Sequence, residues 1–226
     1  VPAELCSRRV PGGVGTTDYS RSSAACNALG EVSQRGGDIQ QLVADAFLEQ
    51  GQRFGGADIS LQNAGGVRVD IPAGNITVGK VYTLLPFKNT LYRLQLTGAQ
   101  VRAALEDGID SVLNGTGSGA YPYTGGLRFS VDMNQARGSR IGNPEVRDAS
   151  GTWKPLDPGA NYRLITNNFT ADGGDKYDTL KAIPAAQRED TFLDYADSFL
   201  QYVRSRSPLA KPAVAGRSTQ SYIETP

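Results

Sequence analysis

A short turn at residues 63–68, which reads Asn-Ala-Gly-Gly-Val-Arg, combines small residues with a planar cation. Gly65 and Gly66 permit positive φ and have no Cβ that would keep a ligand away from the backbone. The guanidinium of Arg68 presents a fork of donors that matches a phosphate or a pair of vicinal hydroxyls. The turn therefore indicates a binding site, although an ordinary strand-to-loop turn with a solvated arginine fits the same residues.

Two further segments place aromatic and acidic side chains beside small residues. Phe87 follows Leu-Pro, and residues 168–175 read Asn-Phe-Thr-Ala-Asp-Gly-Gly-Asp. The rings of Phe87 and Phe169 offer flat apolar faces for stacking, but either could equally fill the core. Asp172 and Asp175 could cap the next turn, and their spacing does not fit the standard calcium loop.

The sequence contains no histidine. This absence excludes a Ser-His-Asp triad, a histidine-ligated zinc site and a histidine general base within the chain. Any chemistry that needs an imidazole must therefore be supplied from outside this chain.

The overall composition argues against two classes of partner. Lys plus Arg and Asp plus Glu both number 23, so no net field favours nucleic acid or an anionic membrane. No apolar run approaches the roughly 20 residues that span a bilayer. We therefore expect no nucleic-acid partner and no membrane span, and any anion binding must be local.

The two cysteines, Cys6 and Cys26, flank a segment rich in Gly, Ser and Thr. We expect them to form a disulfide, worth about 3 kcal/mol in the chain-entropy model and typical of an oxidising compartment. Two free buried thiols are the alternative. Because the sequence starts at Val1 without a signal-peptide pattern, we expect that its original N terminus is missing.

Hydrophobic periodicity predicts one α+β domain with a mixed sheet and packed amphipathic helices at residues 38–226, after a loop-rich lead-in at residues 1–37. We expect Asp38 to cap the first helix. The predicted elements are a helix from residue 38, a strand at 58–62, a short helix at 78–84, a strand at 90–97, a helix at 98–112, strands at 127–132, 139–147 and 162–167, a terminal amphipathic helix that includes Phe192, and an edge strand at 218–224.

In combination and in order, these motifs resemble the C-terminal domain of bacterial and animal 5'-nucleotidases. Residues 96–98, which read Leu-Thr-Gly, and residues 125–129, which read Gly-Gly-Leu-Arg-Phe, add to the resemblance. It extends over residues 38–178 and implies a 5'-nucleotidase C-terminal-domain-like fold. The closing segment, residues 192–220, is most similar to the periplasmic branch that includes NAD-degrading nucleotidases.

The resemblance implies a role for each residue that matches a family motif. Phe87 and Phe169 match the two aromatic residues that sandwich the base, and Asp175 matches the carboxylate that accepts from the ribose hydroxyls. Asn63 matches an amide near the base, and Arg68 matches an arginine that reaches the ribose or the phosphates. Gly65 and Gly66 belong to the same matching turn.

The family has a second arginine on the phosphate side, upstream of the first helix. The lead-in is longer here, so Arg8, Arg9 and Arg35 are all candidates, of which we favour Arg9.

In this family an N-terminal metallophosphatase domain, covalently linked, holds two divalent metals and performs the hydrolysis. The resemblance therefore implies that this chain recognises a nucleotide such as AMP, NAD or a UDP-sugar, needs no cofactor of its own, and is inactive alone. It also implies a periplasmic or cell-surface location. A non-catalytic nucleotide-binding module at the cell surface is the alternative, and similar domains also accompany sulfur-oxidising hydrolases and cyclic-nucleotide phosphodiesterases.

Overall fold

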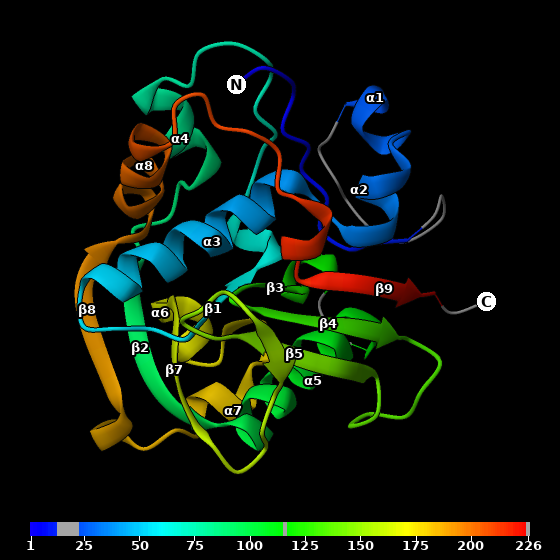
Figure 1. Ribbon diagram of the computed structural model, residues 1–226, viewed down its shortest axis with the longest axis vertical. Helices are drawn as coiled ribbons and strands as arrows, with labels where there is room; N and C mark the ends of the chain where they lie inside the picture. Colours follow the sequence, from blue (N-terminus) through cyan, green and yellow to red (C-terminus); the bar gives the residue numbers. More distant parts are fainter. Residues whose placement is uncertain (13–22, 115–116, 225–226) are drawn as a thin grey trace.

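Two β-sheets form the centre of the structure, a computed structural model that describes residues 1–12, 23–114 and 117–224 (Figure 1). Strands β1 and β7 run parallel at the middle of the first sheet, and β4 and β9 run parallel in the second, whereas all other pairings are antiparallel. The first sheet has the order β3 (Pro122–Gly125), β1 (Ile59–Asn63), β7 (Asn161–Asn167), β2 (Thr90–Thr97), β8 (Arg188–Asp194), and the second has the order β6 (Trp153–Pro155), β5 (Ile141–Arg147), β4 (Leu127–Asp132), β9 (Thr219–Ile223). The predicted α+β class with mixed strands is confirmed.

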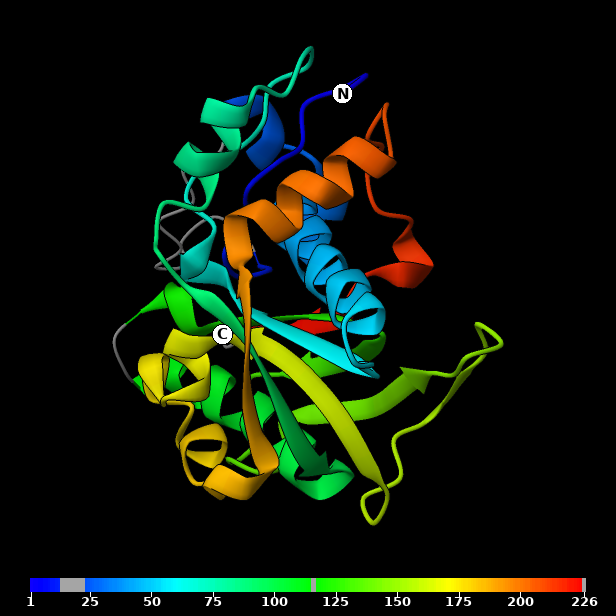
Figure 2. The ribbon, with the colours of Figure 1, turned by 90° about the vertical axis from the view of Figure 1, so that its left-hand side faces the viewer.

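Helices cover both faces of the five-stranded sheet (Figure 2). Leu164 and Ile165 are neighbours on β7, and they belong to separate clusters of buried side chains because successive strand residues face opposite ways. The longer helices are α3 (Asp38–Arg53), α4 (Val78–Leu84), α5 (Gly98–Asn114) and α8 (Tyr195–Ser205). The shorter ones are α1 (Ala24–Asn27), α2 (Gly30–Arg35), α6 (Asn168–Ala171) and α7 (Asp178–Lys181), with 3-10 turns η1 (Ala64–Gly66), η2 (Ser118–Ala120), η3 (Gly174–Lys176), η4 (Ala185–Gln187) and η5 (Val214–Gly216). Helices α3 and α8 pack on one side of the sheet, and α5 packs on the other.

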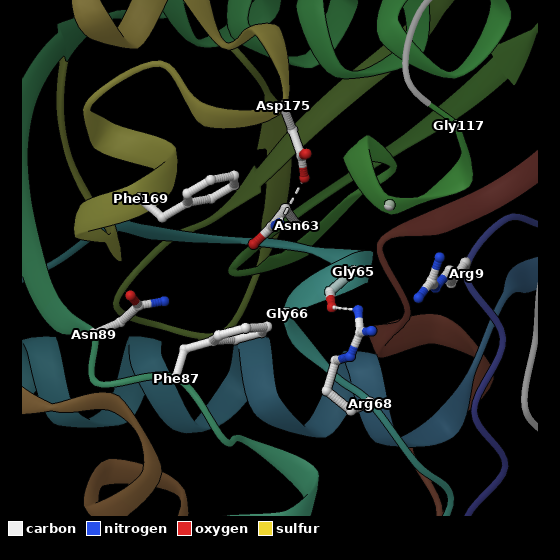
Figure 3. A pocket seen from close by; sticks show the side chains of 11 residues that line it. Arg9, Asn63, Gly65, Gly66, Arg68, Phe87, Asn89, Gly117, Phe169 and Asp175 are labelled. Carbon is white, nitrogen blue, oxygen red and sulfur yellow. Dashed lines mark hydrogen bonds between the residues drawn. The ribbon is translucent and has the colours of Figure 1, made fainter.

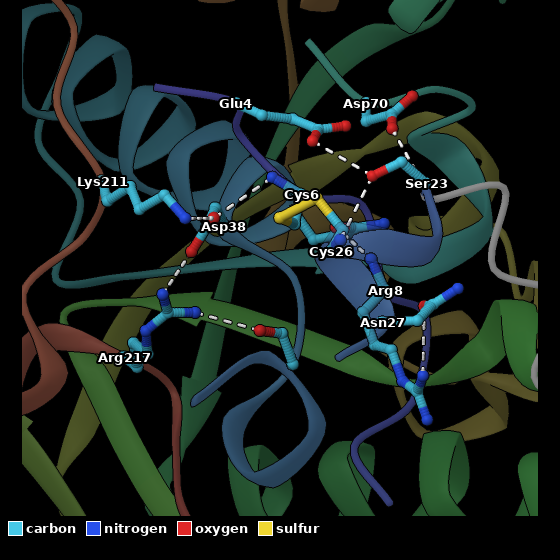
Figure 4. Close-up of a disulfide and its surroundings, with 12 residues drawn as sticks. Glu4, Cys6, Arg8, Ser23, Cys26, Asn27, Asp38, Asp70, Lys211 and Arg217 are labelled. Carbon is cyan, nitrogen blue, oxygen red and sulfur yellow. Dashed lines mark hydrogen bonds and ion pairs between the residues drawn. A yellow bond between two sulfur atoms is a disulfide. The ribbon is translucent and has the colours of Figure 1, made fainter. Parts of the chain in front are cut away.

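Helix α3 forms where the periodicity predicted it, because its apolar residues recur on one face and are fully buried there. The expectation that Asp38 caps this helix is wrong. Gly37 occupies the cap position, and the carboxylate of Asp38 instead accepts from the amide of Cys6 and pairs with Arg217 (Figure 4). Asp38 is completely buried, so these partners satisfy a charge that solvent cannot reach.

The predicted terminal helix begins later than expected. Phe192 lies in strand β8, where it has a φ of 57° and is 83% exposed. Helix α8 starts only at Tyr195, because the side chain of Asp194 accepts from the amide of Asp197 and caps the first turn. Strands β3, β6 and β8 were not predicted, whereas β2, β4 and α4 match the predicted ranges and β9 is the expected edge strand.

The expected disulfide joins Cys6 to Cys26. Helices α1 and α2 also lie within the lead-in, whose residues 13–22 are outside the described part of the chain, and a domain boundary at residue 37 stays a prediction. None of the described helices combines the length and the apolar character that crossing a membrane requires.

Candidate functional site

A cavity of about 350 Å³ opens at the edge of the five-stranded sheet where β1 and β7 end and β2 begins (Figure 3). Of the residues that the sequence marked for ligand binding, all but two of the three candidate arginines line it. The lining consists of Arg9, Asn63, Gly65, Gly66, Arg68, Phe87, Asn89, Gly117, Gly119, Phe169 and Asp175.

The sheet topology explains why segments so distant in sequence meet here. Strands β1 and β7 are parallel neighbours, so Asn63 at the end of β1 lies close to Asn167 at the end of β7. Phe169 follows two residues after Asn167, on helix α6. Strand β2 runs antiparallel to β7, so the loop that carries Phe87 into β2 reaches the same edge.

The two aromatic rings lie on either side of one end of the cavity (Figure 3). Phe87 is 47% exposed and Phe169 is 45% exposed, so neither ring fills the core. Gly174 leaves room for one of them, since a Cβ at this position would come within 2.5 Å of the Phe169 ring. The structure therefore leaves two apolar faces open to a planar ligand.

The buried side chain of Tyr195 holds the loop that carries Phe87. The amide of Phe87 donates to the Tyr195 hydroxyl at 2.6 Å, and the amide of Tyr195 donates to the carbonyl of Asn89 at 3.1 Å. Burial raises the pKa of Tyr195, so this hydroxyl stays neutral at physiological pH. The loop is thus tied to the start of α8 at Phe87 and at Asn89, the two residues on either side of Lys88.

The side chain of Asn63 is oriented by a buried polar network. Its Oδ1 atom accepts from Gln62 Nε2 at 3.1 Å, Asn167 Nδ2 at 3.1 Å and Thr170 Oγ1 at 3.3 Å. Its Nδ2 atom donates to Asp175 Oδ2 at 2.7 Å. Because these three donors hold the oxygen, the amide nitrogen can only face the cavity and Asp175.

Asp175 sits in a conformation that few side chains adopt. Its φ is 55° and that of Lys176 is 67°, in the left-handed region where aspartate is tolerated better than most residues. Such backbone outliers cluster at ligand sites. Asp172, three residues earlier, points elsewhere and pairs with Arg188 at 2.5 Å. Of the two acids, Asp175 is therefore the one that lines the cavity.

Two arginines lie at the opposite end of the cavity from Phe169 (Figure 3). Arg68 Nη1 donates to the carbonyl of Gly65 at 2.9 Å, and its Cζ lies 5.8 Å from the centre of the Phe87 ring. Arg9 lines the cavity beside it. The other two candidates do not: Arg8 is buried and Arg35 donates to the carbonyl of Gln220.

The two glycines of the turn allow close packing and do not use the positive φ that glycine permits. Neither Gly65 nor Gly66 adopts a left-handed conformation. A Cβ on Gly66 would lie 2.1 Å from Gln62 Nε2, and one on Gly65 would lie 3.0 Å from the Cα of Gly119. Gly66 therefore makes room for the network behind Asn63.

Sequence reasoning missed Asn89, Gly117 and Gly119. The signal for Asn89 was its place two residues after Phe87, where the chain enters β2. Gly117 and Gly119 lie in a loop without a motif of its own, and both line the cavity.

Among the described residues that line the cavity there is no group of three possible metal ligands. Within residues 1–12, 23–114 and 117–224, the single group of three possible ligands is Glu4, Cys26 and Asp70, and the sulfur of Cys26 belongs to the disulfide. The Ser23 hydroxyl donates to Glu4 and the Ser23 amide donates to Asp70, which places the two carboxyls beside each other. Burial and a hydrogen bond with Asp70 raise the pKa of Glu4.

Comparisons with known proteins link this chain to one family. A family profile described as "5'-nucleotidase, C-terminal domain" matches residues 13–182. A "Probable 5'-nucleotidase" of Treponema pallidum is 37% identical over 185 residues, covering 80% of this chain and 30% of that protein. An NAD 5'-nucleotidase of Haemophilus influenzae is 38% identical over 152 residues, covering 65% of this chain and 25% of that protein.

Solved structures give the same result. A 5'-nucleotidase precursor from Thermus thermophilus superposes with a TM-score of 0.78 at 33% identity, covering 100% of this chain and 39% of that one. The chain thus spans between 25% and 39% of the length of these relatives.

Proposed function

The chain belongs to the family of 5'-nucleotidase C-terminal domains, and from this membership we propose that it is the substrate-recognition domain of a metal-dependent nucleotide hydrolase. It binds the base and ribose of a nucleotide, of which AMP, NAD and UDP-sugars are the candidate classes. In this assignment Phe87 and Phe169 stack on the base, Asp175 accepts from the ribose hydroxyls, and Arg68 and Arg9 face the phosphate.

The observation that carries the proposal is the convergence on one cavity of side chains from distant segments. Two exposed rings lie at one end, a carboxylate and an amide line the wall, and two guanidiniums lie at the other end. Base, ribose and phosphate follow one another in the same order in a nucleotide. A structural core would bury the two rings, whereas both are nearly half exposed.

We propose that hydrolysis takes place outside this chain. The sequence has no histidine and thus lacks the neutral nitrogen ligands that many catalytic divalent-metal sites use. In the proposed parent, a covalently linked N-terminal metallophosphatase domain would hold two divalent metals, which would activate water for hydrolysis. The residues of this chain hold and orient the nucleotide.

The disulfide supports a periplasmic or extracellular location, because disulfides persist in oxidising compartments and are rare in the cytosol. From the proposed function, the partners of this chain are a nucleotide and the linked metal-binding domain.

Calorimetric titration of the chain with AMP, NAD and UDP-glucose tests the binding proposal. We expect Asp175→Ala to lower the affinity for the preferred ligand by roughly 10- to 100-fold, because hydrogen bonds to a charged acceptor contribute about 1.5–3 kcal/mol. Asp172→Ala is the matched control, since its exposed carboxylate pairs with Arg188 outside the cavity. Equal affinities for the two variants would refute the ribose assignment.

A phosphate-release assay with AMP and Mg²⁺ or Mn²⁺ tests the catalytic half of the proposal. We expect no turnover by the chain alone. Phosphate release at the rate of an intact nucleotidase would show that the catalytic groups lie within this chain.

A further inference from the structure

Arg9 lies on an N-terminal segment that has almost no regular secondary structure of its own. Apart from the isolated bridge at Leu5, residues 1–12 belong to no helix or strand. A cation on a loose segment recognises an anion poorly, because ordering the segment costs free energy on binding. The contacts of the residues around Arg9 therefore decide how well it can serve the cavity.

The first anchor of this segment is the disulfide (Figure 4). Cys6 is bonded to Cys26, its amide donates to Asp38 Oδ2 at 3.1 Å, and its carbonyl accepts from the amide of Ile39 at 3.2 Å. Both cysteines are fully buried. The chain is thus fixed three residues before Arg9 to the N terminus of α3 and to helix α1.

The backbone of Arg8 is the second anchor. Its amide donates to Gln40 Oε1 at 3.2 Å, and its carbonyl accepts from the hydroxyl of Tyr123 at 2.6 Å. Tyr123 is itself buried and accepts from the amide of Gly37 at 2.9 Å. The peptide bond that leads directly into Arg9 is therefore held by a side chain of the central sheet.

The side chain of Arg8 is the third anchor. Its guanidinium turns away from the cavity and donates to the carbonyls of Val10 at 3.0 Å and Gly12 at 2.7 Å, and to Asn27 Oδ1 at 3.4 Å. Asn27 is the neighbour of the disulfide-bonded cysteine on α1. The side chain of Arg8 thus connects the backbone just after Arg9 with the end of helix α1, which carries the disulfide-bonded Cys26.

The same region is joined to the loop of the second arginine. Leu5 and Ile71 exchange backbone hydrogen bonds of 2.8 and 3.1 Å, and Ile71 lies three residues after Arg68. The amide of Ser23, which caps helix α1, donates to Asp70 Oδ2 at 3.3 Å. The two arginine-bearing segments are therefore fixed relative to each other.

We propose that Arg8 and the Cys6–Cys26 disulfide are positioning elements that hold Arg9 beside Arg68 and thereby set the affinity of the cavity for the phosphate group of a nucleotide. This inference rests on the proposed function. The disulfide is fully buried, so it acts as a permanent brace and not as a switch that solvent reductants reach.

The test compares the affinities of AMP and adenosine, which differ by the phosphate alone. Arg9→Ala should lower the affinity for AMP roughly 10- to 100-fold and change the affinity for adenosine by no more than about 2-fold, because only charge-assisted contacts to phosphate are lost. The paired substitution Cys6→Ser with Cys26→Ser should lower AMP affinity selectively in the same way. If the disulfide merely stabilised the fold, its removal would change the affinities for AMP and adenosine by the same factor.

A double-mutant cycle separates positioning from general destabilisation. With Arg9→Ala already present, removing both cysteines should cause no further change in the ratio of AMP to adenosine affinity. Arg8→Gln, which keeps the disulfide but loses the guanidinium fork, should reproduce the selective loss of AMP, and it decides the matter if the cysteine-free variant does not fold.

The outcomes distinguish the two proposals. If the wild-type chain binds neither ligand, the proposed function itself fails. If it binds adenosine and AMP equally well, or if neither the cysteine pair nor Arg8→Gln changes their ratio, the positioning inference is overturned and base and ribose recognition stands.

Discussion

Removing the ring of Phe169 tests the stacking assignment most directly. Phe169 is 45% exposed and its ring rests against Gly174, so Phe169→Ala opens one wall of the cavity with little effect on the core. The side chain is roughly half buried, so its loss should cost about 1 kcal/mol of folding free energy. For a domain of this size that corresponds to a decrease in Tm of about 2–4 °C.

The expected effect on binding is larger than the effect on stability. Stacking of a base on an aromatic side chain contributes about 1–3 kcal/mol, so AMP affinity should fall by roughly 5- to 150-fold. Ribose 5-phosphate has no base and should bind the variant as it binds the wild type. The loss is therefore specific to ligands that carry a base.

Calorimetric titration of both ligands provides the measurement, with Phe192→Ala as the matched control. Phe192 is also a phenylalanine on the surface, 83% exposed, but it lies on β8 outside the cavity. The stacking assignment is wrong if Phe169→Ala binds AMP as tightly as Phe192→Ala does. It is also wrong if AMP and ribose 5-phosphate lose the same factor.

Three further substitutions test the groups that support the cavity and the core. Tyr195→Phe removes the acceptor for the amide of Phe87 and should weaken adenosine binding several-fold while costing about 1–3 kcal/mol of stability, measured by titration and urea unfolding. Gly174→Ala places a Cβ within 2.5 Å of the Phe169 ring and so must displace that ring. In the same titrations the affinity for AMP should fall, whereas the affinity for ribose 5-phosphate should not. Asp45→Asn should stabilise the fold at pH 8 more than at pH 4.5, because burial raises the pKa of Asp45 to about 7 and the fold disfavours its charged form. The wild type loses stability as pH rises from the ordinary pKa of an aspartate to about 7, because the buried carboxyl must then either hold its proton or be charged in the fold. Asp45→Asn avoids this loss, so its free energy of unfolding at pH 8, measured by urea unfolding, should exceed that of the wild type by at most about 4 kcal/mol. The gain should be smaller than this limit because Asp45 is partly exposed.

The parts of the fold that the sequence predicted well are those with a local signal. The apolar residues of α3 recur at helical spacing, and β4 alternates between buried and more exposed positions. Strand β8 gave no such signal, because Phe192 projects into solvent where its apolar character predicted burial. The parallel pairing of β1 with β7 is a long-range contact that no local pattern encodes.

The candidate site divides in the same way. Residues within recognisable motifs, such as Phe87 and Asp175, could be named from the sequence, and the structure brings them to one cavity. Asn89 was not named, because its place two residues after Phe87 is a weak signal and a single polar residue before a strand has many structural explanations. That Gly66 also makes room for the amide of Gln62 could not be predicted, because that amide is a neighbour only in three dimensions.

The buried network behind Asn63 bears on which feature of a nucleotide this cavity selects. Because the Asn63 oxygen is held by three donors, the amide and Asp175 are fixed before any ligand arrives. On the proposed assignment, a ligand without ribose hydroxyls would leave a desolvated carboxylate short of partners, which a site built to bind hydroxyls rejects strongly. Stacking on Phe87 and Phe169, by contrast, tolerates any base, since every base has an aromatic face. On the proposed assignment, the sugar should therefore be recognised more strictly than the base.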